Sequence, residues 1–289
     1  MGIAMRFSGH ETFHCKHFWL KKGYDFVESG NEFKEPEAVV KLGVGKNMVS
    51  SISFWLKAFG LLSTENSELS EFGYYIFSKE SGKDTYLEDE GTLWLLHYML
   101  QKKAYASIYG VAFKEFRKNR VSFDFTATAL SDFIVRKCKI EKYHVSENSI
   151  KSDVKVFLRS YLPPNKQSKS IEDELSALFI DLHVISPVQG LKENGEQVYR
   201  FNYGSHQNIP ILIFLYAVLD YFEDNISISF DDIQDGVSDL FMINREQTLD
   251  LIQELADEKF LTYKEDAGRK EVQLKKGMNM NTLLDKYYV

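Results

Sequence analysis

One order of elements recurs along the chain and constrains its fold more than any other feature. It consists of a short helix, a turn, a longer amphipathic helix and a two-stranded hairpin. In the first copy, Pro36 can begin the short helix, and the next helix is expected from Lys46 to Phe59. Gly60 can end that helix, and LLST and ELS are the expected strands. Helical spacing joins its apolar residues Met48, Ile52, Trp55, Leu56 and Phe59.

Two later segments repeat this order. In the second, FTATALSDFIVRKC leads to a helix that Ser146 can cap and that Pro163 and Pro164 stop. A further helix over 172–185 and a hairpin-like QVYRFNYG follow. The third copy begins with SFDDIQDGVSDLF and ends with a charged hairpin tip, KEDAGRKE, between LTY and VQL. One face of its longer helix carries Leu249, Ile252, Leu255 and Phe260.

The three copies predict a mainly α fold with small antiparallel β hairpins, arranged as tandem winged helix-turn-helix modules around a helical core. Residues 88–120 are expected to form the helical layer between the modules. We expect an N-terminal segment plus a winged helix in residues 1–85. A helical middle region, with a basic block and a second winged helix, is expected in 86–205, and a winged-helix-like domain in 206–289.

The distribution of charge points to a nucleic-acid partner, although the net charge of −7 argues against one. Residues 101–170 hold 15 Lys and Arg against 6 Asp and Glu, whereas residues 171–289 hold 10 against 22. Phosphate binding depends on the potential within about one Debye length, ~8 Å at physiological salt. The local excess of nine positive charges therefore outweighs the total. The alternative is an ordinary solvated helical face.

The cysteine content and the apolar runs predict a cytoplasmic protein. Two cysteines, Cys15 and Cys138, cannot build a disulfide framework or a zinc knuckle. The longest apolar run, IPILIFLYAVL, falls short of the roughly 18 residues of a membrane span. We expect this run to form a buried helix.

The segment HETFH matches H-E-x-x-H, the zinc-protease helix signature. Nine residues precede His10, which is too few for the sheet that such a protease needs, and Gly9 favours a turn over a helix. We instead consider Arg6 a phosphate ligand, His10 a proton carrier and Glu11 its orienting partner or a metal ligand. The alternative is a buried Arg–Glu pair with a hydrogen-bonded histidine that orders the N-terminal segment.

Two polar regions are candidate DNA contacts. The loop LGVGKNM lacks two residues of the phosphate-binding motif G-x-x-x-x-G-K-[ST], but it supplies a helix start with free amides. The basic stretch KEFRKNRVSF can follow a phosphate backbone. The alternative for both regions is a solvated polar face. The candidate contacts are Lys46, Asn47, Ser50, Ser51, Lys57, Lys114, Arg117, Lys118 and Arg120.

Glu88 and Asp89 precede an apolar helix and are weak candidates for a Mg²⁺ site. Acidic residues in this position commonly complement the helix dipole. The sequence favours that capping role over metal binding.

Several segments resemble the bacterial domain-of-unknown-function family 4007, which includes the SspB proteins. They are RFSGHETF, WLKKGYD, LGVGKNMVSSISFWLKAFGLL, LSEFGYYIF and YLEDEGTLWLLHY, all in the first hundred residues. The family motif has proline after GHETF where this chain has His14, so the second histidine of HETFH is incidental to the family. The resemblance implies a DNA nickase for single-strand phosphorothioate modification in anti-phage defence. A cysteine desulfurase, an ATPase and a sulfur-transferring protein are its implied partners.

The leading hypothesis is therefore a DNA-binding nickase of tandem winged helices, with Arg6, His10 and Glu11 as the catalytic residues and Mg²⁺ as the candidate cofactor. The rival hypothesis is a non-catalytic winged-helix adaptor or regulator that binds DNA and recruits partner proteins. The absence of a complete nuclease motif from the sequence favours the rival.

Overall fold

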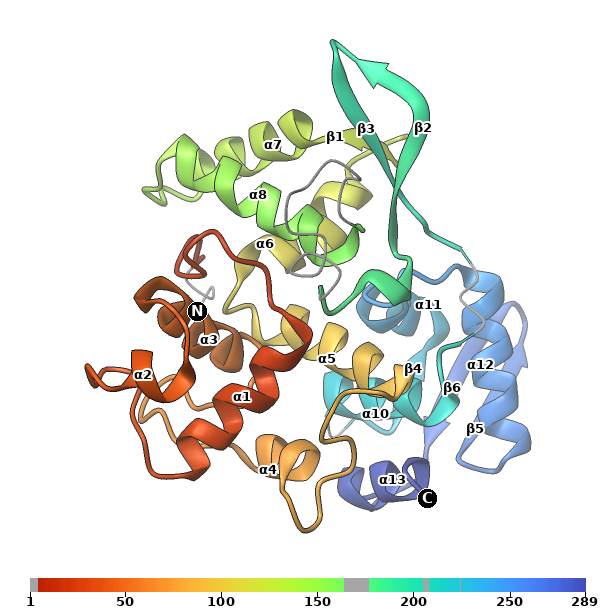
Figure 1. Ribbon diagram of the computed structural model, residues 1–289. Helices are drawn as coiled ribbons and strands as arrows, with labels where there is room; N and C mark the ends of the chain where they lie inside the picture. The colour runs from red at the N-terminus through yellow and green to blue at the C-terminus, as the bar shows by residue number, and fades with distance from the viewer. Residues whose placement is uncertain (1–4, 164–176, 205–207, 224) are drawn as a thin grey trace. The chain divides into compact units, whose positions relative to one another are not determined.

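A computed structural model describes residues 5–163, 177–204, 208–223 and 225–289. These residues form a mainly helical chain with small antiparallel sheets of three strands (Figure 1). The predicted fold class is confirmed to that extent. The chain divides into two compact units: unit 1 comprises residues 1–89 and 99–202, and unit 2 comprises residues 90–98 and 203–289. None of the described helices is both long enough and apolar enough to cross a membrane.

The first part of unit 1 follows the helical spacing of its apolar residues. α3 begins at Lys46, as predicted, and buries Trp55 completely. Gly43 ends α2 in the left-handed conformation, at φ 62°, which forms the predicted turn. The predicted strands LLST and ELS are wrong in extent, because an isolated bridge between Leu62 and Leu69 takes their place. The helices are α1 (His17–Glu28), α2 (Ala38–Leu42), α3 (Lys46–Ala58) and α4 (Glu71–Phe77).

The second part of unit 1 combines helices with a sheet of order β1-β3-β2. Ser146 caps α8 as predicted, because its hydroxyl accepts a hydrogen bond from the Ser149 amide. The helix predicted over 172–185 lies partly outside the described residues. Its described part is the short helix η2, which ends where His183 adopts a φ of 50°. The elements are α6 (Ser107–Gly110), η1 (Val111–Phe116), β1 (Asp124–Thr126), α7 (Ala127–Ile140), α8 (Glu147–Tyr161), η2 (Ile180–Leu182), β2 (Ile185–Glu193) and β3 (Glu196–Phe201).

Unit 2 contains the predicted buried helix, the third amphipathic helix and its hairpin. The first nine residues of α5 (Glu90–Lys103) belong to this unit. They are tied to it by His97, whose Nε2 lies 2.9 Å from the Leu240 carbonyl, and by Tyr98, whose hydroxyl donates to Asp220. The other elements are α10 (Ile211–Phe222), β4 (Ser227–Ser229), α11 (Phe230–Ile233), η3 (Gln234–Ser238), α12 (Arg245–Asp257), β5 (Leu261–Asp266), β6 (Arg269–Leu274) and α13 (Met280–Tyr287).

The two sheets share one topology. In unit 1, a short strand leads into α7 and α8, and the hairpin of β2 and β3 follows; β3 then pairs with the first strand. In unit 2, β4 leads into α11, η3 and α12, and β6 of the following hairpin pairs with β4. The strand order is first-third-second in both cases. The second and third copies of the sequence repeat therefore share one structural topology, whereas the described residues of the first copy form, in place of a hairpin, only the bridge between Leu62 and Leu69.

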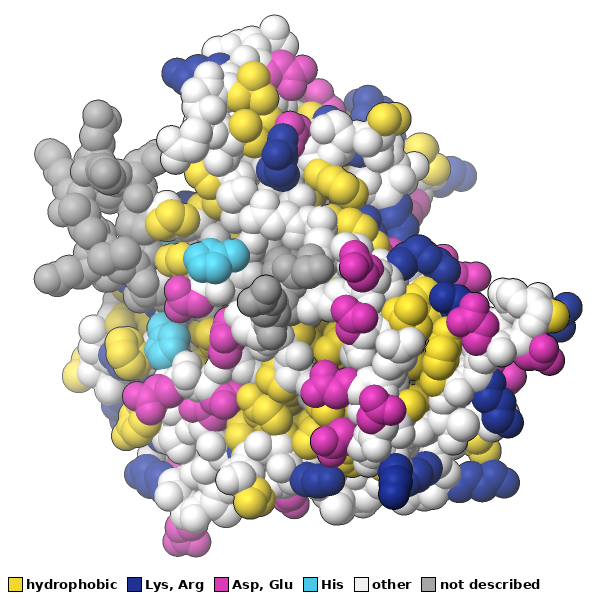
Figure 2. All heavy atoms as spheres, turned by 90° about the vertical axis from the view of Figure 1, so that its right-hand side faces the viewer, with side chains coloured by type: hydrophobic (Ala, Val, Ile, Leu, Met, Phe, Trp, Pro, Cys, Tyr) yellow, Lys and Arg dark blue, Asp and Glu magenta, His cyan; other side chains and the backbone are white. Residues whose placement is uncertain are grey.

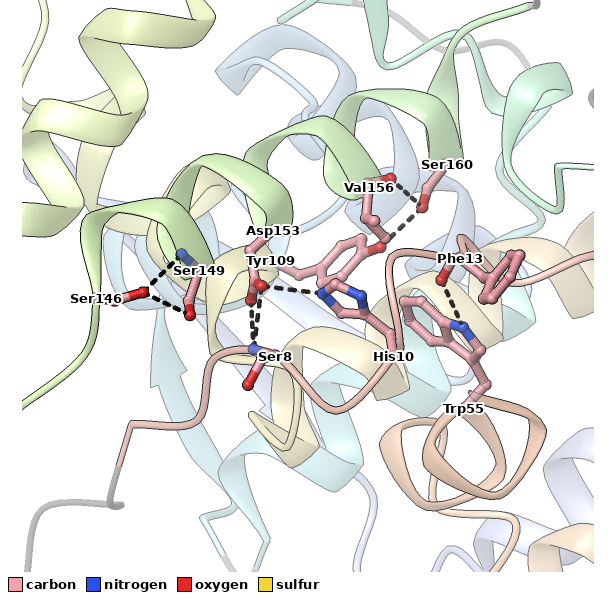
Figure 3. A network of polar contacts seen from close by, with 10 residues as sticks. All are labelled: Ser8, His10, Phe13, Trp55, Tyr109, Ser146, Ser149, Asp153, Val156 and Ser160. Carbon is pink, nitrogen blue, oxygen red and sulfur yellow. Dashed lines mark hydrogen bonds and ion pairs between the residues drawn. The ribbon is translucent and has the colours of Figure 1, made fainter. Parts of the chain in front are cut away.

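The N-terminal segment is held on α8 by a buried carboxylate (Figure 3). Asp153, 2% exposed, accepts hydrogen bonds of 3.0 Å from the Ser8 amide at both carboxylate oxygens. Its Oδ1 also lies 3.0 Å from Nε2 of His10, which is 3% exposed. Further along the segment, the Trp55 indole donates to the Phe13 carbonyl over 3.2 Å. These contacts with α8 and α3 fix residues 8–13, which themselves belong to no helix or strand.

We expect Asp153→Ala to release this segment and to destabilise unit 1. Removing one member of a buried polar pair leaves His10 and the Ser8 amide buried without their partner, which costs on the order of 3 kcal/mol. Urea unfolding followed by tryptophan fluorescence measures the loss, and amide hydrogen exchange measures the release of residues 8–13. Asp132→Ala, an exposed helical aspartate on α7, is the matched control. Equal stability of the two variants would contradict the anchoring role.

Candidate nucleic-acid interface

A groove of about 900 Å³ opens on unit 1, at the base of the N-terminal segment. Its wall is assembled from the N-terminal segment, the C-terminal ends of α3 and α5, the bridged turn after α3 and the loop after α7. Its polar lining side chains are Arg6, Lys57, Ser63, Thr64, Glu65, Ser70, Lys103, Tyr105 and Tyr143. The groove therefore joins two residues that the sequence assigned to different roles, Arg6 and Lys57.

Three cations face this groove and create an excess of positive charge. Within the described residues, no ion pair links Arg6, Lys57 or Lys103 to a carboxylate. Burial and the nearby Arg6 guanidinium lower the pKa of Lys57 from its usual value. Like charges held together in this way favour an anionic ligand, because the ligand relieves their repulsion.

The Arg6 side chain is exposed, but its surroundings orient it. Its guanidinium carbon lies 4.0 Å from the centroid of the Tyr105 ring and 5.6 Å from that of Phe54. Its backbone amide donates to Ser107 Oγ, and its carbonyl accepts from the Ser107 amide. Gly9 is required beside it, since its φ is +96° and a Cβ there would lie 2.9 Å from the Phe54 ring. Arg6 is thus presented to the groove in a defined position.

The Lys103 side chain passes close to Gly60. A Cβ on Gly60 would lie 2.8 Å from Lys103 Cε, and Gly60 has a φ of +71°. The glycine that ends the first helical segment therefore also makes room for a lysine from α5. Lys103, Tyr105 and Tyr143 could not be assigned to this groove from the sequence, because nothing in the local pattern shows that they approach α3.

HETFH does not form the helix that a zinc protease needs. Glu11 and Thr12 have φ values of 48° and 67°, so the segment is a turn, as Gly9 predicted. His10 and His14 are buried, whereas Glu11 is exposed. Asp153, not Glu11, lies beside His10. The described residues contain no group of three His, Cys, Asp or Glu side chains suited to hold a metal ion.

His10 and Arg6 flank the same aromatic ring. The Phe54 ring centroid is 5.7 Å from that of His10, with the two rings at 87°. On its other side, the His10 ring stacks on Trp55 at 6.1 Å and 15°. His10 Nδ1 is buried and has no hydrogen-bond partner among the described residues. Arg6 and His10 therefore lie close together, as predicted, but His10 is buried.

The start of α3 is separate from the groove. Lys46, Asn47 and Ser50 are exposed there, and α3 has 13 residues. At about 1.5 Å per residue, the start of α3 lies roughly 16 Å from Lys57. Ser51 is fully buried, so we withdraw it as a DNA contact. The reason is its spacing, because it shares the face of α3 that carries Trp55.

The basic stretch of residues 114–123 is partly exposed and partly buried. Arg117 is 6% exposed and donates through Nε to the Phe113 carbonyl, so it too is withdrawn as a DNA contact. Lys118 is exposed and Lys114 is half-buried. Arg120 donates to the Asp124 carbonyl and lines a smaller hollow of about 260 Å³.

Glu88 and Asp89 lie at the start of α5 beside another carboxylate. Both oxygens of Asp84 accept hydrogen bonds from the amides of Glu88 and Asp89, at 2.9 and 3.0 Å. Asp84 therefore holds the turn that leads into the helix. In the part of the chain that the structure describes, these carboxylates do not form a ready Mg²⁺ site with further acidic or histidine ligands.

Comparison with known proteins identifies the family. Two solved structures resemble the chain, a magnesium ion-bound SspB crystal structure with a TM-score of 0.84 and an SspB crystal structure with a TM-score of 0.82. Each is 29% identical in sequence, and each match covers 98% of this chain and 87% of the SspB chain. No curated protein matches the chain significantly. The model of the family described as protein of unknown function DUF4007 matches residues 7–288, so the chain belongs to this SspB-like family.

Proposed function

We propose that this protein binds DNA in the groove of unit 1 and nicks one strand during phosphorothioate modification of DNA, in the cytoplasm, as part of anti-phage defence. The convergence of Arg6, Lys57 and Lys103 on one groove is the observation that carries the proposal. The similarity to SspB supplies the biological context. A cysteine desulfurase, an ATPase and a sulfur-transferring protein are the proposed partners.

The charges support DNA binding by unit 1 in preference to unit 2. Unit 2 holds 8 Lys and Arg against 17 Asp and Glu. Figure 2, which views the side of Figure 1 where α12 and β5 lie, shows carboxylates among cations and hydrophobic side chains, without a continuous basic surface. α12 itself exposes Glu246, Asp250, Glu254 and Asp257. A phosphate backbone would be repelled by this helix.

We interpret the repeated strand–helix–helix–hairpin units as winged-helix modules. The order β4, α11 with η3, α12, β5 and β6, preceded by α10, supports this interpretation for unit 2. The order β1, α7, α8, β2 and β3 supports it for unit 1. Because α12 is acidic, we propose that the module of unit 2 contacts a partner protein and that DNA contacts come from unit 1. Lys46, Asn47, Ser50, Lys114, Lys118 and Arg120 remain proposed contacts along the DNA backbone.

The proposed reaction is hydrolysis of a phosphodiester bond. Arg6 binds the scissile phosphate and stabilises the charge that develops on it. His10 accepts the proton of the attacking water, and Asp153 stabilises the imidazolium that forms. The oxygen–phosphorus bond to the leaving strand breaks, and the leaving oxygen is protonated from solvent. Because His10 is buried, residues 8–13 must shift before Nδ1 reaches the water.

Because residues 8–13 would have to shift before His10 could act, a second candidate function is also supported, that of a non-catalytic adaptor. A histidine that is 3% exposed and held by a buried carboxylate is typical of a structural anchor. In this alternative, the groove holds DNA while a partner protein cuts it or adds sulfur. The groove and its cations have the same role in both hypotheses.

The double substitution Lys57→Gln and Lys103→Gln is expected to lower the affinity for DNA. It should also make that affinity less dependent on the salt concentration. Each lost phosphate contact reduces the slope of log K against log salt by about 0.7 to 0.9. Fluorescence anisotropy at several salt concentrations measures both quantities. Lys34→Gln, which removes an exposed lysine outside the groove, is the control and is expected to leave the slope unchanged. An unchanged slope in the double variant would exclude the groove as the phosphate site.

Supercoiled plasmid separates the nickase from the adaptor. With purified protein and Mg²⁺, a nickase converts the plasmid to open circles, and we expect Arg6→Ala and His10→Gln to abolish this conversion. Glu11→Gln tests the remaining expectation that Glu11 takes part, while Glu254→Gln on α12 is the control. Plasmid that is bound but stays supercoiled would support the adaptor and refute the nickase.

A further inference from the structure

We propose that the groove of unit 1 holds unpaired nucleotides of a single DNA strand and contacts their bases as well as their phosphates. This inference rests on the proposed DNA binding at the groove and specifies the form of DNA that is bound. It depends on two features that a phosphate site does not require. The aromatic side chains of Tyr105 and Tyr143 lie beside the cations, and the carboxylate of Glu65 also lines the groove.

The flat side chains provide stacking surfaces. Tyr105 and Tyr143 are half-buried and line the groove. The Tyr143 ring packs against Phe7, with 6.1 Å between centroids, and the Arg6 guanidinium lies over the Tyr105 ring. Unpaired bases stack on aromatic rings and on arginine guanidinium planes. In a closed duplex the bases are already stacked on one another, so a duplex gains nothing from these surfaces.

Glu65 indicates contact with base edges. Its carboxylate is exposed at the groove, and no ion pair holds it to Arg6, Lys57 or Lys103. A phosphate backbone offers hydrogen-bond acceptors and negative charge, so a carboxylate opposes its binding. The exocyclic amino groups of cytosine, adenine and guanine donate hydrogen bonds that a carboxylate accepts. Thymine offers only its N3–H, which lies between two carbonyl oxygens that repel a carboxylate. We therefore infer a preference for an amino-bearing base over thymine.

The size of the groove agrees with this form of ligand. A volume of about 900 Å³ lies within the range of pockets that enclose small ligands, ~300–1,000 Å³. Such a space suits a few nucleotides of one strand. The phosphates can then contact Arg6, Lys57 and Lys103 while a base lies against Tyr143.

The test measures binding of the full chain to labelled dC12, dT12 and a 12-base-pair duplex by fluorescence anisotropy at pH 8. We expect both single strands to bind roughly tenfold or more tightly than the duplex, and dC12 to bind more tightly than dT12. Tyr143→Ala should weaken single-strand binding roughly tenfold and leave duplex binding unchanged, whereas Tyr143→Phe should retain it. Glu65→Gln should reduce the preference for dC12 without weakening binding of dT12.

Equal binding of duplex and single strands, with no effect of Tyr143→Ala, would overturn this inference. If the Lys57 and Lys103 variant still weakened that binding, the proposed DNA-binding function would stand. Failure of every DNA to bind would instead refute the proposed function. Circular dichroism confirms that each variant is folded. If the alanine variant is unstable, the comparison of single strands with the duplex on the unaltered chain still decides the inference.

Discussion

The buried carboxylate of Asp153 is the contact on which the candidate site depends. It joins two parts of the chain that are 145 residues apart, through the Ser8 amide and the His10 ring. A buried carboxylate loses the solvation of water, and this loss is tolerable only where hydrogen bonds replace it. Asp153 obtains these bonds from the Ser8 amide, and Nε2 of His10 adds a polar contact at 3.0 Å. Both residues lie just beyond Arg6. Satisfying this one side chain therefore also fixes the segment that brings Arg6 to the groove.

The same topology carries opposite surface chemistry in the two units. Both contain a strand, two helical segments and a hairpin whose second strand pairs with the first. The hydrophobic pattern sets this topology, since strand and helix faces must bury Phe125 in one unit and Ile228 in the other. The exposed faces are free to differ, because exposed charges contribute little to stability. A shared fold therefore does not imply a shared ligand.

Much of the fold could be predicted from the sequence, because helical spacing and capping are local. The start of α3 at Lys46, the Ser146 cap and the hairpin after α12 follow from neighbouring residues. The same spacing could have excluded Ser51, which lies four residues before Trp55 on the buried face. It could also have excluded Arg117, four residues after the buried Phe113.

The candidate site was predictable in part. Arg6 and Lys57 were each identified as candidates from their own segments. That both residues line one groove could not be predicted. Lys103 and Tyr143 come from distant segments, and a lone lysine or tyrosine gives no sequence signal of its place in a groove. Asp153 was hidden for the same reason, since the histidine that it holds is 143 residues away. Glu11 was assigned to His10 because it is adjacent in sequence, but the left-handed turn at Glu11 and Thr12 leaves Glu11 exposed.

The net negative charge and the basic groove are compatible because they act over different distances. At physiological salt, charges separated by more than ~8 Å are largely screened, so carboxylates farther than this from Lys57 would hardly affect a phosphate bound to it. At low salt their repulsion extends further and opposes the approach of DNA. Added salt thus weakens the contacts in the groove and also relieves this repulsion. In the proposed complex, the groove would therefore select a strand at short range, through its aromatic and hydrogen-bonding groups, more than it would attract DNA from a distance.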